Sequence, residues 1–203
     1  MKIICIGRNY AKHAQELNND VPQEPVFFLK PDSAILQKNK PFYIPDFTKE
    51  VHYEVEVLFR ICRLGKNIST KFAPRYYSEV GLGIDFTARD VQQELKSQGL
   101  PWEKAKAFDA SAVLGEFLPV DHFEDLSNID FCLKKNGEIV QKGNTKEMLF
   151  DVNHLVAHTS KYMTLKIGDI IFSGTPEGVG KVEIGDRLQG FIGDKMMFDF
   201  MVK

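Results

Sequence analysis

Three carboxylates in two short apolar segments are the residues of this chain best suited to chemistry. Glu54 and Glu56 alternate with valine in a β-prone run, and a strand points residues i and i+2 to the same face. Asp85 lies near the end of a second mostly apolar run, residues 80–86, which also predicts a strand. If the two strands are neighbours, we expect the three carboxylates to project toward one spot.

A cluster of three carboxylates needs a compensating charge. Two anions about 4 Å apart repel by roughly 4 kcal/mol at an effective dielectric constant of about 20, so the cluster must be protonated or bind a cation. An all-oxygen set suits Mg²⁺, Mn²⁺ or Ca²⁺ better than zinc, and three protein ligands leave about three octahedral positions for water or substrate. The Glu-x-Glu pattern alone more often marks the solvent-facing side of a strand, with Asp85 then a turn residue.

The rest of the chain predicts the elements that would hold these carboxylates. A hairpin is expected around Asn136-Gly137, which is a strong turn dipeptide. After residue 162, short apolar segments alternate with Gly-Asp turns, a pattern typical of a compact β-rich fold and not of a βαβ sheet. The other expected elements are helices over 11–18, 90–98 and 151–162 and strands over 2–6 and 26–30.

Composition and charge restrict the class of protein. The 203 residues are 43% hydrophobic and 27% charged, with a formal net charge of -2, which is ordinary for a globular protein; we expect one domain over 1–203. Basic residues are scattered among acidic ones, which argues against nucleic acid and membrane partners and favours a small molecule. Three widely spaced cysteines predict free thiols, and the first apolar run is too short for a signal peptide, so we expect the cytoplasm.

Six motifs occur in one order along the chain: Gly7-Arg8-Asn9-Tyr10, Phe28-Leu29-Lys30-Pro31, Glu54-x-Glu56, Asp85-x-Thr87-Ala88-Arg89-Asp90, Lys106-x-Phe108 and Ser173-Gly174-Thr175-Pro176-x-Gly178-Val179-Gly180. Together they resemble the fumarylacetoacetate hydrolase family, and most closely its short acylpyruvate hydrolase and oxaloacetate decarboxylase branch. The resemblance implies an α+β, β-rich fold, a mixed β-roll or sandwich with a few peripheral helices, usually as a homodimer.

The resemblance implies a metal centre and a base. Glu54, Glu56 and Asp85 match the family's ligands of Mg²⁺ or Mn²⁺, which makes the exposed-strand interpretation the weaker one. His13 and Glu16 lie three residues apart on the expected first helix, where a carboxylate could orient an imidazole. Taken alone such a pair is more often an ordinary helix contact, but it matches the family positions that act as the base.

The resemblance implies roles for five further polar residues. Lys106 matches the family's active-site lysine. Arg8 and Thr175 match positions that contact the carboxylate or keto acid end of the substrate. Arg89 and Gln92 match polar groups near the metal.

The activity implied by the resemblance is metal-dependent cleavage of the carbon–carbon bond of an acylpyruvate. Water activated by His13 and Glu16 would attack the distal carbonyl, and pyruvate would leave as its enolate. Oxaloacetate decarboxylation yields the same enolate, so one site could serve both reactions on a small 2-keto acid or 1,3-diketo acid. The alternatives are an oxaloacetate keto-enol tautomerase, a 2-hydroxyhepta-2,4-diene-1,7-dioate isomerase or, outside enzymes, a metal-stabilised binding protein. Asp109, where near relatives carry a small hydroxyl residue, leaves substrate choice open.

Overall fold

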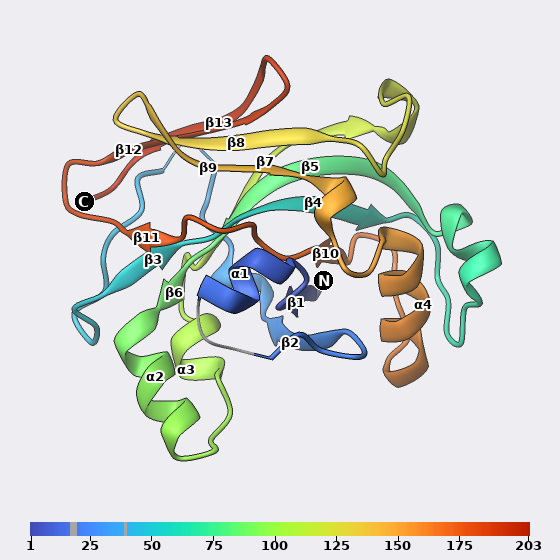
Figure 1. The fold of residues 1–203 in the computed structure, drawn as a ribbon, viewed down its shortest axis with the longest axis horizontal. Helices are drawn as coiled ribbons and strands as arrows, with labels where there is room; N and C mark the ends of the chain where they lie inside the picture. Colours follow the sequence, from blue (N-terminus) through green and yellow to red (C-terminus); the bar gives the residue numbers. More distant parts are fainter. Residues whose placement is uncertain (17–19, 39) are drawn as a thin grey trace.

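A computed structural model describes residues 1–16, 20–38 and 40–203 of the protein. The strands in this part of the chain form three sheets, with the orders β2-β1-β10-β4-β5-β7, β13-β12-β8-β9 and β11-β3-β6 (Figure 1). Their bounds are β1 Ile3–Gly7, β2 Val26–Lys30, β3 Val51–Tyr53, β4 Val55–Ile61, β5 Tyr77–Asp85, β6 Thr87–Ala88, β7 Ala112–Pro119, β8 Asp130–Lys135, β9 Glu138–Asn144, β10 Ile170–Phe172, β11 Gly180–Lys181, β12 Arg187–Ile192 and β13 Lys195–Met201.

The helices are short and lie around the sheets, with α2 beside α3 at one end of the molecule and α4 at the other (Figure 1). In the large sheet β1 and β10 are parallel and the other pairs are antiparallel. The expectation of a β-rich α+β fold with mixed sheet and peripheral helices is therefore confirmed. The bounds are α1 Ala11–Glu16, α2 Arg89–Ser97, α3 Glu103–Lys106 and α4 Val152–Tyr162, with 3₁₀ turns at η1 Asp32–Ala34, η2 Thr70–Arg75, η3 Val120–His122 and η4 Thr145–Glu147.

The central strands β4 and β5 carry the core. Nearly all their side chains are buried, because the β13-β12-β8-β9 sheet packs against one face of the large sheet. Gly190 of β12 allows the two sheets to come close, since a Cβ atom there would lie 2.9 Å from Leu82 of β5; it would also lie 2.3 Å from the ring of Phe198 on the paired strand β13. Strands buried on both faces read as continuous apolar runs, which is why β5 was recognisable from its sequence.

The expectation of one continuous strand through Glu54 and Glu56 is wrong in one respect. The chain leaves the small β11-β3-β6 sheet after Tyr53 and enters the large sheet at Val55, so Glu54 lies at the junction of two sheets. The Val55 N–H donates to the side chain of Gln141 at 2.9 Å, and the Glu54 carbonyl accepts from the Asp85 N–H at 2.9 Å. These two hydrogen bonds take the place of regular strand pairing where the chain passes from one sheet to the other. They hold the backbone of Glu54 beside that of Asp85.

The other predicted elements agree with the structure to within a few residues. Asn136 and Gly137 both have positive φ, at 55° and 87°, as a two-residue hairpin turn between twisted strands requires. Helix α4 begins after Asp151, whose side chain accepts from the His154 N–H at 2.8 Å. The predicted end of the first helix falls in residues 17–19, outside the described residues. Among the described residues, no helix is long and apolar enough to cross a membrane.

Candidate metal centre and active site

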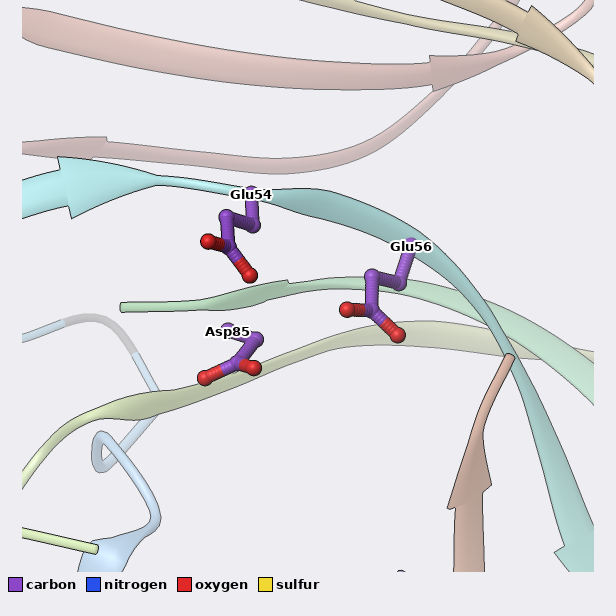
Figure 2. A group of neighbouring side chains, drawn as sticks. All are labelled: Glu54, Glu56 and Asp85. Carbon is purple, nitrogen blue, oxygen red and sulfur yellow. The ribbon is translucent and has the colours of Figure 1, made fainter. Parts of the chain in front are cut away.

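The three predicted carboxylates meet in the structure. Glu54 projects from the junction before β4, Glu56 from β4 and Asp85 from the last residue of β5 (Figure 2). One oxygen from each lies within 4.8 Å of the others, and all three residues are buried. The expectation that they converge is confirmed, and the interpretation that places them on an exposed strand face is wrong.

Lys106 and Arg89 balance the charge of Glu54. The Lys106 ammonium donates to Glu54 Oε2 and to Asp85 Oδ2, each at 2.7 Å, and the Arg89 guanidinium donates to Glu54 Oε1. Burial opposes ionisation of Glu54, but the two cations outweigh it and hold the pKa of this carboxyl well below its usual range. Burial lowers the pKa of Lys106, but the charges of Asp85 and Glu54 outweigh it and raise this pKa above its ordinary value.

Lys30 is a fully buried cation whose role the sequence did not indicate. Its ammonium lies 2.7 Å from Asp85 Oδ1 and donates to the carbonyl oxygens of Phe86, Lys106 and Ser111 and to the Ser111 hydroxyl. In the sequence Lys30 belongs to the Phe28-Leu29-Lys30-Pro31 motif and ends an apolar strand immediately before a proline, but neither feature assigned it a role. Its contacts tie β2 to the ends of β5 and α3, and so support the Asp85 side of the carboxylate cluster.

Replacing Lys30 with methionine should destabilise the folded protein by about 3 kcal/mol, because a buried carboxylate and several carbonyl groups would lose their partner together. Urea unfolding of the metal-free protein measures this change. Lys104→Met, which removes an exposed lysine of α3, is the matched control and should change stability by less than about 0.5 kcal/mol. An equal, small effect of both substitutions would contradict the role given to Lys30.

Glu56 is the carboxylate that lacks a cation. It accepts the Gly174 N–H at 2.7 Å, and among the described residues no lysine, arginine or histidine lies within ion-pair distance of it. Burial raises the pKa of Glu56 well above its usual range, and the charges of Asp85 and Glu54 raise it further. Gly174 has φ of +99°, and a Cβ atom there would lie 2.8 Å from the Asn9 side chain, so a glycine is needed where this N–H meets Glu56.

This cluster fits a divalent cation. Asp85 Oδ1 is buried and has no aligned hydrogen-bond donor among the described residues, although Lys30 is close to it. A dication between the three carboxylates would satisfy this oxygen and stabilise the ionised form of Glu56. The donor set is all oxygen, which suits Mg²⁺ or Mn²⁺.

A narrow cavity lies beside the cluster and brings together most of the predicted site residues. Glu54 and Asp85 form part of its wall, and the phenyl ring of Phe28 forms an apolar part. Two wall residues, Lys96 and Trp102, were not predicted. The remaining predicted residues that line it are Arg8, His13, Arg89, Gln92, Lys106 and Thr175.

His13 and Glu16 form the expected pair at one side of the cavity. His13 Nδ1 lies 3.2 Å from Glu16 Oε2, and His13 is buried although it belongs to a short helix. Glu16 also accepts the Gly178 N–H at 3.1 Å, which joins α1 to the loop after β10. The Glu16 carboxylate therefore contacts both the His13 imidazole and the loop that contains Gly178.

Thr175, Arg89 and Gln92 are held by their neighbours. The Thr175 hydroxyl accepts from Gln141 Nε2 at 2.9 Å, and the Arg89 guanidinium donates to Gln92 Oε1 at 2.6 Å. Gln141 is a second residue that the sequence did not indicate, because a glutamine in a hairpin strand carries no distinctive signal. It links the Thr175 loop to the backbone at Val55.

Arg8 lies between β1 and α1. Its backbone has φ of 60°, a conformation that residues other than glycine rarely adopt. The next residue, Asn9, anchors this bend: its amide group donates to the carbonyl oxygens of Ser173 and Phe150, and its Oδ1 accepts from the Phe150 N–H. The Arg8 side chain is thereby held at the cavity wall.

Comparison with known proteins assigns the family. The family model described as fumarylacetoacetate (FAA) hydrolase C-terminal matches residues 2–198. The chain is 43% identical over 206 residues to the mitochondrial oxaloacetate decarboxylase of Dictyostelium discoideum, covering 100% of this chain and 94% of that protein. It is 42% identical over 188 residues to oxaloacetate tautomerase YcgM of Escherichia coli (strain K12), covering 92% of this chain and 86% of that protein.

A solved structure agrees with this assignment. Fumarylpyruvate hydrolase from Pseudomonas aeruginosa, in complex with Mn²⁺ and pyruvate, superimposes with a TM-score of 0.93 at 34% sequence identity, covering 100% of this chain and 89% of that chain. The fold and the sequence both match one class of β-rich enzymes. The chain belongs to the fumarylacetoacetate hydrolase family.

Proposed function

We propose that the protein is a divalent-metal-dependent enzyme that acts on oxaloacetate and interconverts its enol and keto forms. The observation that carries this proposal is the buried group of Glu54, Glu56 and Asp85, which adjoins a cavity lined by four cationic side chains. Such a cavity suits a small anionic acid. Relatives more than 40% identical to this chain are named oxaloacetate decarboxylase and oxaloacetate tautomerase, which supports oxaloacetate as the substrate.

Glu54, Glu56 and Asp85 would hold Mg²⁺ or Mn²⁺. When bound, the ion would supply a Lewis acid for the carboxylate and keto oxygen of the substrate. The presence of Mn²⁺ and pyruvate in the solved relative supports this assignment.

Lys106 and Arg89 would act on the metal ligands. The Lys106 ammonium has three hydrogens, and all three are used by Glu54, Asp85 and the Thr87 hydroxyl. Lys106 therefore fixes two ligands in ionised form, and it could contact a substrate only by giving up one of these bonds. We propose the same positioning role for Arg89, while Thr175 and Arg8 would contact the substrate itself.

In enol–keto exchange a proton leaves the enol oxygen on C2, a proton adds to C3, and the C2=C3 double bond is replaced by the C2=O double bond. The carbon skeleton stays intact, and no water attacks. The reaction therefore depends on the groups that hold the enolate and only weakly on a base that activates water. The hydrogen bonds around Glu54 and Asp85 would keep the polar groups of the site aligned during the exchange.

The proposal is tested by giving the purified, Mg²⁺-loaded protein two substrates side by side. The enol form of oxaloacetate is followed by its ultraviolet absorbance. Pyruvate release is followed from both oxaloacetate and acetylpyruvate, and the rate measured with Mg²⁺ but without protein is subtracted. Rapid loss of the enol without matching pyruvate release identifies a tautomerase. Matching pyruvate release from oxaloacetate identifies a decarboxylase, and no effect on oxaloacetate rejects the proposal.

Hydrolysis of acylpyruvates is the second candidate, and the His13–Glu16 pair favours it. A carboxylate at Nδ1 selects the tautomer whose Nε2 can accept a proton, which is the arrangement needed to activate a water molecule. The fumarylpyruvate hydrolase among the solved relatives adds support. A 2-hydroxyhepta-2,4-diene-1,7-dioate isomerase and a metal-stabilised binding protein stay as alternatives.

His13→Ala should separate these two reactions. If His13 is the base that activates water, its loss should lower acetylpyruvate hydrolysis by about 10²- to 10⁴-fold and should lower oxaloacetate enol–keto exchange much less. His122→Ala, at an exposed histidine that does not line the cavity, is the control and should change neither rate. Equal loss of both activities in His13→Ala would count against a hydrolytic base.

We propose, on the family resemblance, that the protein forms a homodimer and that one domain spans 1–203. A cytoplasmic location stays a prediction; the Dictyostelium relative is named as mitochondrial.

A further inference from the structure

The cavity contains more positive charge than the carboxylate cluster uses. Arg89 and Lys106 both pair with Glu54, and Lys106 also pairs with Asp85. Arg8 and Lys96 line the same cavity, yet neither forms an ion pair with any described residue. Two cations that face a cavity without a counterion are suited to an anionic ligand.

Helix α2 places Lys96 farther from the carboxylate cluster than Arg89. Arg89, Gln92 and Lys96 follow one another at i, i+3 and i+7, so they share one face of the helix. Arg89 contacts Glu54 and Gln92 contacts Arg89, whereas Lys96 lies about 10 Å farther along the helix axis from Arg89. The helix thus lines the cavity from the carboxylate cluster outward.

The Lys96 side chain is held in place at this position. Its ammonium lies 5.3 Å from the centre of the Trp102 ring, and Trp102 packs edge-on against Phe28 with the ring centres 6.1 Å apart. Both aromatic rings line the cavity. A half-buried lysine fixed by an aromatic face loses less side-chain entropy when it binds an anion than a free surface lysine does.

We infer that Lys96, together with Arg8, binds the distal carboxylate of the substrate and makes the site selective for dicarboxylic 2-keto acids. This inference rests on the proposed function, because it requires the 2-keto acid end to lie at the Glu54, Glu56 and Asp85 cluster. Oxaloacetate has a second carboxylate and acetylpyruvate does not. Lys96 is therefore the residue that separates the two candidate substrates.

The electrostatics at Lys96 agree with this role. Burial lowers the pKa of Lys96, and the positive charges of Arg8, Arg89 and Lys106 lower it further. A carboxylate bound between Lys96 and Arg8 would relieve this repulsion.

Binding of a matched pair of ligands tests the inference without enol–keto turnover. Difluorooxaloacetate has no hydrogen on the carbon between its carbonyl and its distal carboxylate, so it cannot enolise; difluoro-2-oxobutanoate has a methyl group in place of that carboxylate. Calorimetric titration of the Mg²⁺-loaded wild type should give tighter binding of the dicarboxylate by about tenfold or more. In Lys96→Met this preference should fall to about twofold or less, and in Lys96→Arg most of it should return.

Kinetics supply a second readout. Lys96→Met should raise KM for oxaloacetate by about tenfold and leave kcat nearly unchanged, because the distal carboxylate takes no part in proton exchange. Lys104→Met removes an exposed lysine of neighbouring α3 that does not line the cavity, so it should change neither KM nor ligand preference. If the effect of Lys96→Met came only from the loss of one positive charge from the protein, Lys104→Met would show the same effect.

The outcomes separate this inference from the proposed function. A wild type that binds both ligands equally, or a Lys96→Met variant that keeps the full preference, overturns the role of Lys96 even if oxaloacetate is the substrate. A preference that depends on Lys96 in a protein that does not act on oxaloacetate upholds the role of Lys96 and rejects the proposed function.

Discussion

Lys106→Met is expected to lower turnover of oxaloacetate by about 10- to 100-fold, the range seen when a group that orients metal ligands is removed, because Glu54 and Asp85 would lose the ammonium that fixes them. It should also destabilise the metal-free protein by about 3 to 5 kcal/mol, because two buried carboxylates would lose their shared cation. Mg²⁺ should restore part of this stability by supplying positive charge at the same place. Enzyme kinetics and urea unfolding, each with and without Mg²⁺, measure these effects.

Lys104→Met is the matched control for Lys106→Met, since it removes an exposed lysine two residues away on the same helix. It should leave both turnover and stability close to the wild type. Unchanged kinetics in Lys106→Met would show that this lysine neither orients the ligands nor stabilises charge during the reaction.

Glu56→Gln is expected to abolish metal-dependent turnover while leaving the metal-free protein at least as stable as the wild type. Glutamine can keep an oxygen for the Gly174 N–H but removes the carboxylate that has no cation beside it. Mg²⁺ should therefore raise the melting temperature of the wild type and have little effect on that of Glu56→Gln. Glu103→Gln, an exposed glutamate of α3, should respond to Mg²⁺ as the wild type does.

The difference in stability between the metal-free wild type and Glu56→Gln should depend on pH. Because the pKa of Glu56 is raised in the metal-free folded state, this state retains a proton that the unfolded chain releases near the ordinary pKa of glutamate. The contribution of Glu56 to stability is therefore lost as pH rises from that ordinary value toward the raised one. The stability of the metal-free wild type relative to Glu56→Gln should fall over this interval, and a flat or rising difference would contradict the assignment.

The carboxylate cluster could be predicted because short periodicities specify it. Alternation puts Glu54 and Glu56 on one side of the chain, and the apolar run before Asp85 marks a buried strand. The break between β3 and β4 could not be predicted, because the side chain of Gln141, from a hairpin almost ninety positions away, bonds the backbone there. The residues around position 54 do not indicate such a long-range hydrogen bond.

Lys30 and Lys96 show two further limits of sequence reasoning. Lys30 resembles an ordinary strand-ending lysine, and only the tertiary structure surrounds it with four acceptors and a carboxylate. Lys96 was detectable in principle, because it continues the helical face of Arg89 and Gln92. Its significance depends on a cavity and on the absence of a counterion among the described residues, and neither property is local in sequence.

The metal dependence of the proposed reaction is tested most directly by the rate at which the enol of oxaloacetate disappears in the presence of three samples: Mg²⁺-loaded protein, protein stripped with a chelator, and stripped protein reloaded with Mg²⁺ or Mn²⁺. We expect fast enol loss with the loaded protein, only the uncatalysed rate with the stripped protein, and recovery on reloading. Fast enol loss that persists in the stripped protein would contradict a metal-dependent site at Glu54, Glu56 and Asp85. Loaded protein that leaves the uncatalysed rate unchanged would contradict the proposed reaction.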